Sequence, residues 1–441
     1  MHNDPPLRSD HIEEQHIIRK ISATTSGTPD ATHDVVIHRA RVFDGRKVLA
    51  GLHDIGLRGD VISSVSAERL RGVTEIDAAD GWLMPGLIDT HVHVYDVGAV
   101  TGPESMRSFE DGRLPGLLDL FLQHGVTTIK SVGDPTTEIV RTRTMIATGA
   151  LKGPRLLATG CGITGRNGHP AATVFAANPW ARERFTTEVD NVRQLRDVIN
   201  HLADLQVDAI KLLTEGACAR HDSPGYVWHN PAFPDAVDLV RLPRGILRAG
   251  IDAAHERRLR VTVHTTQQDA AREAVDAGAD GLEHGVIVEP ITDDSLIESM
   301  LRQGVTYAPT LWAHDATHPD ARSNAEKVAS AGVDVVLGSD TFTGGGLFGA
   351  NTVKEAELMV AAGMTPVQVL TAGTSAAARH CARPDLGTIG PGKRADLLVL
   401  AADPTTAIDN LRRVVLTIMG GQIVVDRRAS TRTTNHEEQW R

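Results

Sequence analysis

The chain has 441 residues, 41% of them hydrophobic, so it is long enough to bury a large core in one or more domains. Its net charge of −11 argues against a nucleic-acid binder, because phosphate contacts need clustered Lys and Arg. Three cysteines cannot form a disulfide framework, which favours a reducing, cytoplasmic location. No stretch approaches the roughly 20 apolar residues of a membrane span, and the first residues lack the pattern of a secretory signal. We expect a cytoplasmic protein without nucleic-acid or membrane partners.

Two β-rich pieces lie near opposite ends of the chain. Residues 34–85 contain short β-branched runs separated by Asp44-Gly45 and Gly59-Asp60, which are typical of turns between strands. Residues 381–428 repeat the pattern, with Gly420-Gly421 as the expected hairpin tip. We predict that these two pieces form one small β-sandwich. The polar residues 1–33 and 429–441 outside them predict a flexible arm and a flexible tail.

The middle of the chain, residues 86–380, alternates strand-like and helix-like stretches, which predicts βα units on a parallel sheet. Amphipathic stretches such as NVRQLRDVINHLADL and GILRAGIDAAHERR separate eight strand candidates, which are LIDTHVHV, VTTIKSVG, RLLATGCGI, DAIKLLTEG, RVTVHT, DGLEHG, VTYAPTL and DVVLGSDT. Eight strands in one series predict an α/β fold with a closed (β/α)₈ TIM-like barrel. Long segments at 95–115, 164–186 and 217–236 are expected to cover its site.

A histidine pair ends the first strand candidate. His91 and His93 are two residues apart, so a strand points both imidazoles to the same face. This arrangement suits two ligands of one metal ion, whereas the alternative is a chance pair among the 20 histidines of the chain. Because barrel enzymes build their sites at the C-terminal ends of their strands, we favour the metal interpretation.

Three further residues end later strand candidates. His264 follows RVTV, His284 follows GLE and Asp340 follows VVLGS. A lone histidine is more often bonded to a backbone carbonyl, and an aspartate before a helix is often its N-cap. At successive strand ends they instead predict metal ligands, and Asp340 could also accept a proton from a bound water.

Lys211 follows DAI in the fourth strand candidate. An ammonium group has no acceptor and cannot bind a metal. A neutral lysine that reacts with carbon dioxide becomes a carbamate, whose two oxygens can bridge two ions, and this step requires burial or nearby cations. The alternative is a structural lysine paired with Glu215 or Asp208.

The motifs together resemble the amidohydrolase superfamily, and within it the imidazolonepropionase-like and prolidase-like metal-dependent hydrolases. They are PGLIDTHVHV, HGVTTIKSVGD, DAIKLL, VTVHT, AGADGLEHG, APTL, LGSD and GTIGPGKRADLLVL, and the likeness runs from about residue 34 to 426. The resemblance implies a barrel plus a small β-sandwich from both chain ends. It also implies the ligands of two divalent ions: His91, His93 and Asp340 for one, His264 and His284 for the other, and carboxylated Lys211 as the bridge.

The implied reaction is hydrolysis of an amide-type C–N bond of a small molecule by a metal-bridged hydroxide, with Asp340 passing the proton to the leaving amine. Zn²⁺ is the expected ion, although nitrogen and oxygen ligands also accept Mn, Co or Fe. The first alternative is a mononuclear deaminase or imidazolonepropionase-like cyclic amide hydrolase. Such enzymes carry a glutamate shortly after the third histidine, whereas TTQQD follows His264 here. A non-catalytic scaffold is the second alternative, and the filled ligand positions oppose it. A homo-oligomer is compatible with the sequence.

Substrate-binding candidates lie on the long loops. His169 in GRNGHP, which also has a catalytic interpretation, and Arg166 beside it form one group, and the other contains Arg220, His221, Tyr226 and His229. Each has an alternative as a solvated loop residue. GRNGHP and KLLTEG both depart from the glycine-rich forms of the prolidase-like group. The substrate could therefore be a dipeptide, an N-acyl amino acid, or a urea-like or carbamate-like molecule. Aromatic residues near these loops could form an apolar wall: Phe175, Trp180, Tyr226, Trp228, Phe233 and Trp312.

Overall fold

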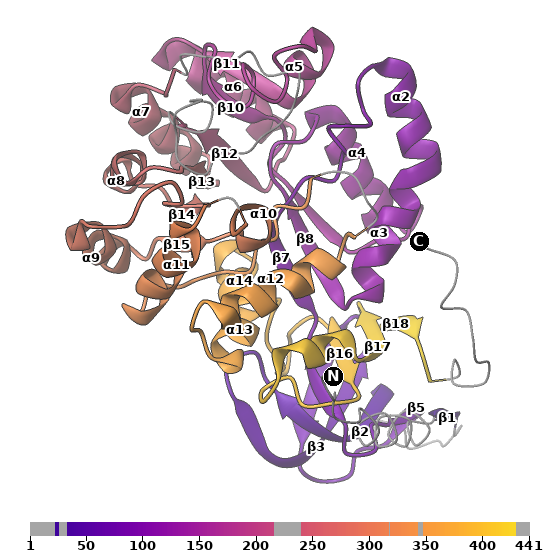
Figure 1. Ribbon diagram of the computed structural model, residues 1–441. Helices are drawn as coiled ribbons and strands as arrows, with labels where there is room; N and C mark the ends of the chain where they lie inside the picture. Colours follow the sequence, from indigo (N-terminus) through magenta and orange to yellow (C-terminus); the bar gives the residue numbers. More distant parts are fainter. Residues whose placement is uncertain (1–22, 26–32, 216–239, 317, 343–346, 429–441) are drawn as a thin grey trace, which may run out of the picture. The chain divides into compact units, whose positions relative to one another are not determined.

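The computed structural model describes residues 23–25, 33–215, 240–316, 318–342 and 347–428 (Figure 1). The chain divides into two compact units. Unit 1 contains Met1–Leu87, Leu122–Thr127 and Asp385–Arg441, and unit 2 contains Ile88–Phe121 and Thr128–Pro384. Within the described residues, no helix is long and apolar enough to cross a membrane.

Unit 1 is built on a sheet for which nine strands are described. They are β1 (Ala23–Thr25), β2 (His33–Phe43), β3 (Val48–Arg58), β4 (Val61–Ser66), β5 (Gly72–Asp77), β6 (Trp82–Pro85), β16 (Leu397–Leu400), β17 (Val414–Met419) and β18 (Gln422–Asp426). The order is β1-β5-β2-β6-β16-β17-β18, and off this path β3 pairs with β2 and β4 pairs with β3. The antiparallel pairing of β6 with β16 joins the two ends of the chain in one sheet, as the sequence predicts. The 3₁₀ helix η2 (Ile408–Arg412) precedes β17.

The predicted turns of unit 1 are present where glycine tolerates a positive φ. Gly420 and Gly421, with φ of 55° and 77°, connect β17 to β18. Two successive residues in the left-handed region match the twist of a two-residue hairpin, which explains the Gly-Gly pair. Alternate side chains of the strands, such as Ile37 and Val399, are fully buried in the core of this unit. The period-two pattern of the sequence therefore determines which face is covered.

Unit 2 contains two sheets whose described pairs are parallel. One has the order β7-β8-β9, with β7 (Leu87–Val92), β8 (Val126–Ser131) and β9 (Arg155–Ala158). The other has the order β11-β10-β12-β13-β14-β15, with β10 (Gly162–Gly165), β11 (Thr186–Val189), β12 (Ala209–Leu213), β13 (Arg260–His264), β14 (Gly281–Glu283) and β15 (Thr306–Ala308). The third strand candidate, RLLATGCGI, is thus two strands rather than one. Gly160 separates them with a φ of +72°, a conformation that ends an extended run.

The eighth strand candidate is also not a regular strand. Residues 334–341 form isolated parallel bridges, Tyr307 with Val335 and Val92 with Thr341. The Thr90 amide donates to the carbonyl of Leu337 at 2.8 Å, so this segment hydrogen-bonds to β7 on one side and to β15 on the other. At the opposite seam, the Asp208 amide donates to the Ala158 carbonyl at 2.7 Å, beside β9 and β12. Backbone hydrogen bonds thus connect the two sheets at both seams.

The helices connect and cover these strands in chain order (Figure 1). They are α2 (Pro103–Ser108), the π-helix η1 (Phe109–Arg113), α3 (Leu114–Gln123), α4 (Thr136–Ala147), α5 (Pro179–Phe185), α6 (Val192–Asp204), α7 (Arg244–Glu256), α8 (Gln268–Ala277), α9 (Asp294–Gln303), α10 (Leu311–His314), α11 (Asp320–Ser330), α12 (Ala350–Ala361), α13 (Pro366–Ala372) and α14 (Ser375–His380). The predicted helices at NVRQLRDVINHLADL and GILRAGIDAAHERR are α6 and α7. In α6, Leu195, Ile199 and Leu202 are buried at helical spacing, and the Asn191 side chain caps its first turn. The segment 95–115, expected as a loop, contains α2 and η1.

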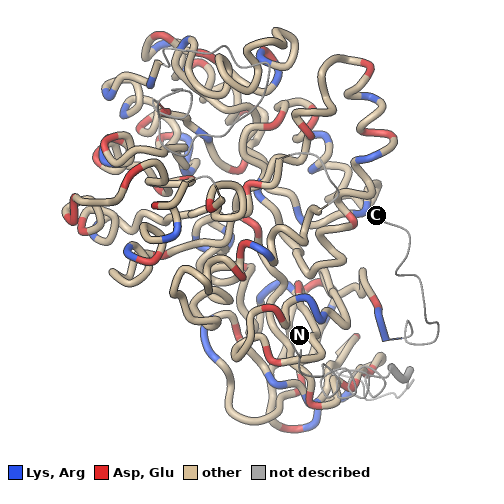
Figure 2. The backbone as a smooth tube through the Cα atoms, viewed as in Figure 1, with Lys and Arg blue, Asp and Glu red and all other residues tan. Residues whose placement is uncertain are grey.

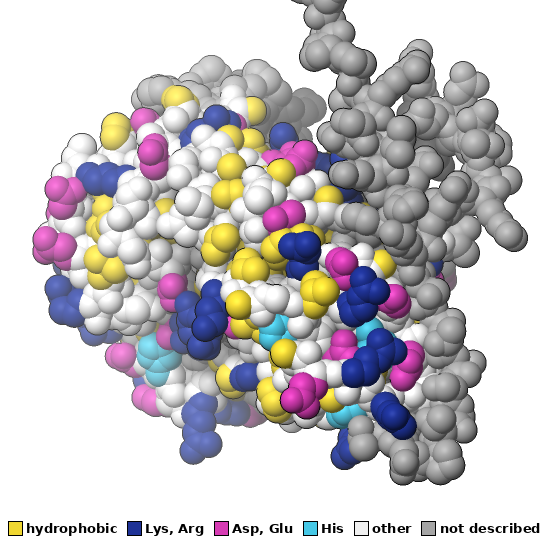
Figure 3. Space-filling model, turned by 90° about the horizontal axis from the view of Figure 1, so that it is seen from below, with side chains coloured by type: hydrophobic (Ala, Val, Ile, Leu, Met, Phe, Trp, Pro, Cys, Tyr) yellow, Lys and Arg dark blue, Asp and Glu magenta, His cyan; other side chains and the backbone are white. Residues whose placement is uncertain are grey.

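The surface carries mixed charge. Figure 2 shows acidic and basic positions interleaved along the outer helices of unit 2. On the face shown in Figure 3, hydrophobic side chains are interspersed with Lys, Arg, Asp and Glu. In the views shown, charges of both signs are thus mixed over the described part of the chain.

Candidate metal centre and its cavity

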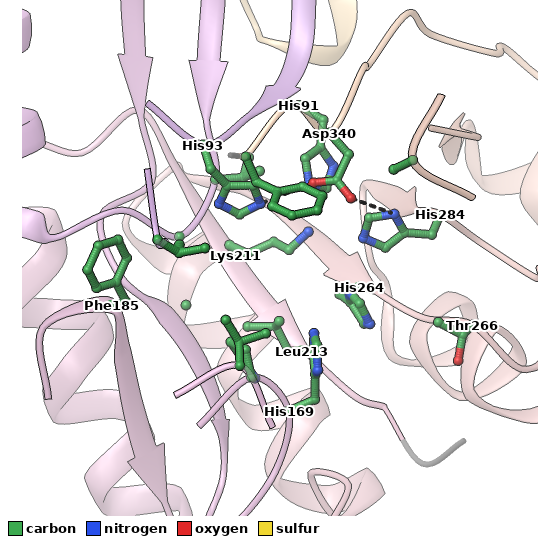
Figure 4. A pocket seen from close by; sticks show the side chains of 18 of the residues that line it. His91, His93, His169, Phe185, Lys211, Leu213, His264, Thr266, His284 and Asp340 are labelled. Atoms are coloured by element: carbon green, nitrogen blue, oxygen red, sulfur yellow. Dashed lines mark ion pairs between the residues drawn. The ribbon is translucent and has the colours of Figure 1, made fainter. Parts of the chain in front are cut away.

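One cavity of about 110 Å³ lies in unit 2 at the C-terminal ends of β7, β12 and β13 and beside β14. Four of the six predicted metal ligands, all histidines, lie at or just after strand ends. Lys211 lies within β12, and Asp340 joins them from the segment that bridges to β7 (Figure 4). All six line the cavity: His91, His93, Lys211, His264, His284 and Asp340. Parallel strands present their C-terminal ends to one edge, so residues up to 249 positions apart in the sequence meet there.

His91, His93 and Asp340 form the first cluster. Asp340 Oδ1 lies 3.3 Å from His91 Nε2 and 3.2 Å from His93 Nε2. One ligand atom of each residue lies within 4.8 Å of the others, which is close enough for one ion to contact all three. Burial raises the pKa of the Asp340 carboxyl, but the histidines, His91 foremost, outweigh it, and the pKa lies well below its usual range. Asp340 is therefore a carboxylate at neutral pH.

Three residues around this cluster have a left-handed backbone. His284, Thr310 and Asp340 have φ values of 65°, 47° and 50°. The conformation is uncommon outside glycine, and for the β-branched Thr310 it is an outlier. The backbone holds it locally, since the Asp340 amide donates to the His91 carbonyl at 2.8 Å and the His284 amide to the Ala308 carbonyl at 2.9 Å. Strained residues of this kind concentrate where side chains must be aimed at a site.

His264 and His284 form the second cluster, and their rings are 4.5 Å apart between centroids. His284 Nδ1 lies 2.7 Å from the Thr310 hydroxyl and 3.8 Å from Asp340 Oδ2 (Figure 4). His314 on α10 joins them, with Nε2 at 3.2 Å from His284 Nδ1 and 3.5 Å from Asp340 Oδ2. His284, His314 and Asp340 thus form a second group with metal-ligand spacing. The sequence-based prediction missed His314, because it lies three residues beyond the APTL motif with no strand periodicity to place it.

Lys211 lies between the two clusters on β12 and is 2% exposed. Its Nζ has no hydrogen-bond partner among the described residues. The alternative of a structural lysine is therefore wrong for the expected partners, since Glu215 binds His264 and Asp208 binds Arg143. Burial lowers the pKa of Lys211 to about 8. A buried amine of this kind is costly unless another group satisfies it, and it is more often neutral than an ordinary lysine.

The buried carboxylate of Glu283 contacts His91 of the first cluster. Its Oε2 accepts a hydrogen bond from His91 Nδ1 at 2.7 Å, and its Oε1 accepts one from Lys130 at 3.1 Å. Burial raises the pKa of Glu283, but Lys130 and His91 hold it well below its usual range. The carboxylate keeps the proton of His91 on Nδ1 and leaves Nε2 facing Asp340. In the sequence, the one indication that Glu283 belongs to the site is its position directly before His284 in GLEHG. No sequence pattern indicated that Lys130 lies there.

The remaining wall of the cavity is mainly apolar. It comprises Val97, Val132, Pro170, Val174, Phe175, Phe185, Leu213, Ala313 and Phe342. Of the aromatic residues predicted to form an apolar wall, Phe175 lines the cavity. Trp180 instead packs against the guanidinium of Arg184, and Trp312 is not among the lining residues. Within this lining, Asp340 is the one carboxylate and Lys211 the one amine.

His169 lines this cavity, as predicted, and its ring stacks on that of His264 at 4.8 Å. Its Nδ1 lies 2.8 Å from the Thr173 hydroxyl. Burial, followed by the neighbouring His264, lowers the pKa of His169 to about 3, so the ring is neutral at physiological pH. A neutral imidazole at the wall can donate or accept one hydrogen bond from a substrate.

Arg166 does not belong to this cavity. Its exposed guanidinium binds Asp190, on the segment that follows β11. The structure therefore does not bring Arg166 into the lining of this cavity, and its contact with substrate stays a prediction. The other predicted substrate-binding residues, Arg220, His221, Tyr226 and His229, lie outside the described residues, as do Trp228 and Phe233.

Comparison with known proteins agrees with this geometry. A model of the amidohydrolase family matches residues 82–424. An uncharacterised protein of Mycobacterium tuberculosis is 27% identical over 364 residues, which cover 78% of this chain and 85% of that protein. A crystal structure of a Xaa-Pro dipeptidase with bound methionine superposes with a TM-score of 0.73 at 23% identity, covering 88% of this chain and 99% of the other. Phenylurea hydrolase B gives 0.73 at 22% identity, with 90% and 97% covered.

The two solved structures show a shared α/β fold. Their sequence identities are too low to support an inference about activity or substrate. The family match spans most of the chain and includes every residue of the candidate metal centre. The resemblance seen in the sequence motifs is thereby confirmed, and the chain belongs to the amidohydrolase family.

Proposed function

We propose that this protein is a metal-dependent hydrolase that cleaves an amide-type C–N bond of a small, largely apolar molecule. The observation that carries the proposal is the buried Nζ of Lys211, which lies between two histidine clusters and has no hydrogen-bond partner among the described residues. A carbamate on this nitrogen would give two anionic oxygens to two divalent ions. The donor set fits such ions, since histidine nitrogens and carboxylate oxygens are ligands for zinc. Zn²⁺ is the ion we propose.

Each of the six predicted metal ligands has a proposed role in the reaction. His91, His93 and Asp340 would hold one ion, and His264 and His284 the other, with carboxylated Lys211 between them. Two bound ions supply a water of lowered pKa and polarise the carbonyl that is attacked. Asp340 would accept the proton of that water and deliver it to the leaving nitrogen, because it is the ionised carboxylate at the cavity. The mononuclear alternative is less well supported, because it leaves Lys211 without a role.

The cavity favours a neutral substrate over a dipeptide. A free substrate carboxylate needs a cation. Among the described lining residues Lys211 is the one amine, which the proposed carbamate would neutralise, and Arg166 is bound to Asp190 outside the cavity. The apolar wall around Phe175 and Phe185 suits an acyl or aryl group. We therefore place ureas, carbamates and N-acyl compounds ahead of dipeptides. Arg220, His221, Tyr226 and His229 stay predicted substrate-binding residues.

Several coarser features stay part of this proposal. The hydrogen bonds at both seams of unit 2 support a closed (β/α)₈ barrel, with residues 334–341 taking the eighth position. Three features are predictions from the sequence alone. They are the domain boundaries at residues 33, 85, 380 and 428, the cytoplasmic location, and the compatibility with a homo-oligomer.

The test is elemental analysis of protein grown with zinc and bicarbonate, followed by hydrolysis assays. We expect close to two ions per chain and turnover of phenylureas, carbamates or N-acyl amines that exceeds turnover of dipeptides. One ion per chain, with deamination of cyclic or aromatic amines, would favour the mononuclear alternative. Two ions with dipeptide turnover alone would contradict the neutral substrate class.

Assembly of the metal centre is expected to depend on pH and bicarbonate. With a pKa of about 8, the neutral fraction of Lys211 rises from about 3% at pH 6.5 to about 76% at pH 8.5. A lysine at 10.5 would be about 1% neutral at pH 8.5. After chelation, the rate at which the protein regains its second ion should therefore rise steeply over this range, and only with bicarbonate. In Lys211→Met we expect no recovery of the second ion at any pH, and a recovery profile identical to that of the unaltered protein would contradict the carbamate.

His169→Ala is expected to raise KM about tenfold and to lower kcat less, because the lost group binds substrate rather than the metal ions. Steady-state kinetics on the best substrate measure both constants. His201→Ala, on the exposed face of α6, is the matched control. An unchanged KM would remove His169 from the substrate site, and a loss confined to kcat would make it a catalytic residue.

A further inference from the structure

A buried carboxylate lies directly behind the second histidine cluster. Glu215 follows β12, four residues after Lys211, and its side chain is 0% exposed. Its Oε2 lies 2.9 Å from His264 Nε2, and its Oε1 accepts a hydrogen bond from the Thr266 hydroxyl at 2.8 Å. Both contacts join the end of β12 to the end of β13. Glu215 thus contacts one predicted metal ligand from the side opposite the cavity.

This contact determines which nitrogen of His264 faces the metal position. A carboxylate has acceptors only, so the proton of the His264 ring must lie on Nε2 and point at Glu215. The lone pair is then on Nδ1. A metal-ligating imidazole is neutral, so its other nitrogen carries the one ring proton, which here is the proton that Glu215 accepts.

The first cluster shows the reverse arrangement. Glu283 accepts from His91 Nδ1 and leaves Nε2 towards Asp340. Each cluster therefore has one histidine oriented by a buried carboxylate, through opposite ring nitrogens. Because a flexible imidazole would otherwise exchange tautomers and rotate, such a partner raises the affinity for the ion.

We propose that Glu215 is a positioning residue that holds His264 with Nδ1 presented to the second metal ion. This inference rests on the function proposed above, and it assigns a role to the acidic residue in KLLTEG that departs from the glycine-rich form. A different role, as an acid or base acting on substrate, is less well supported. The carboxylate is sealed from the cavity, whose wall at this place is formed by His264 and Thr266.

The test compares stepwise metal affinities of the full-length chain, measured by competition with a chromophoric zinc chelator. Glu215→Gln keeps the shape but removes the charge, and its amide can no longer impose one tautomer. We expect one of the two zinc equivalents to weaken by about 10-fold to 100-fold while the other keeps its affinity. Glu256→Gln, an exposed partner of Arg196, is the matched control and should change neither.

If Glu215→Gln does not fold, a second variant provides the test. Thr266→Val keeps the carboxylate and removes its other hydrogen bond, so the same equivalent should weaken by a smaller factor. Unchanged affinities, or equal weakening of both equivalents, would overturn the proposal. So would unchanged affinity together with loss of one limb of the pH profile of kcat/KM, since that outcome identifies an acid or base.

The outcomes for Glu215 and for the proposed function are separable. A wild-type chain that binds fewer than two ions contradicts the binuclear function whatever the variants do. The role of Glu215 is then still decided by whether the bound ion weakens in Glu215→Gln. A wild-type chain with two ions and an unaffected variant overturns only the role of Glu215.

Discussion

Lys211→Ala is expected to lose one of two bound ions and to lower kcat/KM at least about 1000-fold, which corresponds to about 4 kcal/mol at the transition state. The reason is that Lys211 Nζ is the buried group between the clusters, and its removal leaves both ions without the shared anionic ligand. Metal content by elemental analysis and steady-state kinetics measure the two effects.

Short carboxylates provide a specific rescue of this variant. Acetate or propionate can enter the space vacated by the side chain and place two oxygens where the carbamate would lie. We expect partial recovery of the second ion and of activity. Lys354→Ala, an exposed residue paired with Glu357, is the matched control and should resemble the unaltered protein. Two bound ions and full activity in Lys211→Ala would contradict the hypothesis that Lys211 carries a bridging carbamate.

Asp340→Asn is expected to lower kcat by about 100-fold to 10,000-fold, the range for loss of a general acid–base group. The amide keeps the size of the side chain but cannot accept a proton. It also loses the charge that lies 3.3 Å from His91 and 3.2 Å from His93, so affinity for the first ion should fall. Kinetics on fully metal-loaded protein separate the two effects.

The control for this variant lies on the same segment. Asp334→Asn alters an exposed carboxylate that pairs with Arg379, and we expect unaltered kcat. If Asp340→Asn retained the kcat of the unaltered protein with both ions bound, another group would have to accept the proton. His314, at 3.5 Å from Asp340, would be the first residue to examine.

Local sequence determined much of the architecture. The spacing of Leu195, Ile199 and Leu202 predicts α6, because a helix repeats every 3.6 residues. Gly420-Gly421 predicts its hairpin, because both residues adopt a positive φ. The residues His91 and His93 could be placed on one face from their spacing alone. These features depend on interactions within a few residues of each other.

Irregular backbone limited the prediction at two strands. RLLATGCGI has no polar run that marks a break, and the break at Gly160 depends on how β10 pairs with β11 and β12. The segment 334–341 has a strand-like composition, yet it contacts its neighbours only through isolated bridges. Pairing partners far away in sequence decide both cases, and composition carries no information about them.

The sequence by itself determined the family, the alternation of strands and helices, and the six residues brought together at the cavity. Only the tertiary structure decided their surroundings: Glu283 behind His91, Glu215 behind His264, His314 beside Asp340, and Arg166 turned away to Asp190. The physical reason is that strand ends can be read from local periodicity, whereas a hydrogen-bond partner depends on which strands become neighbours. The environment of Lys211 follows from the same cause, since burial of its Nζ without a hydrogen-bond partner among the described residues is a property of the assembled fold.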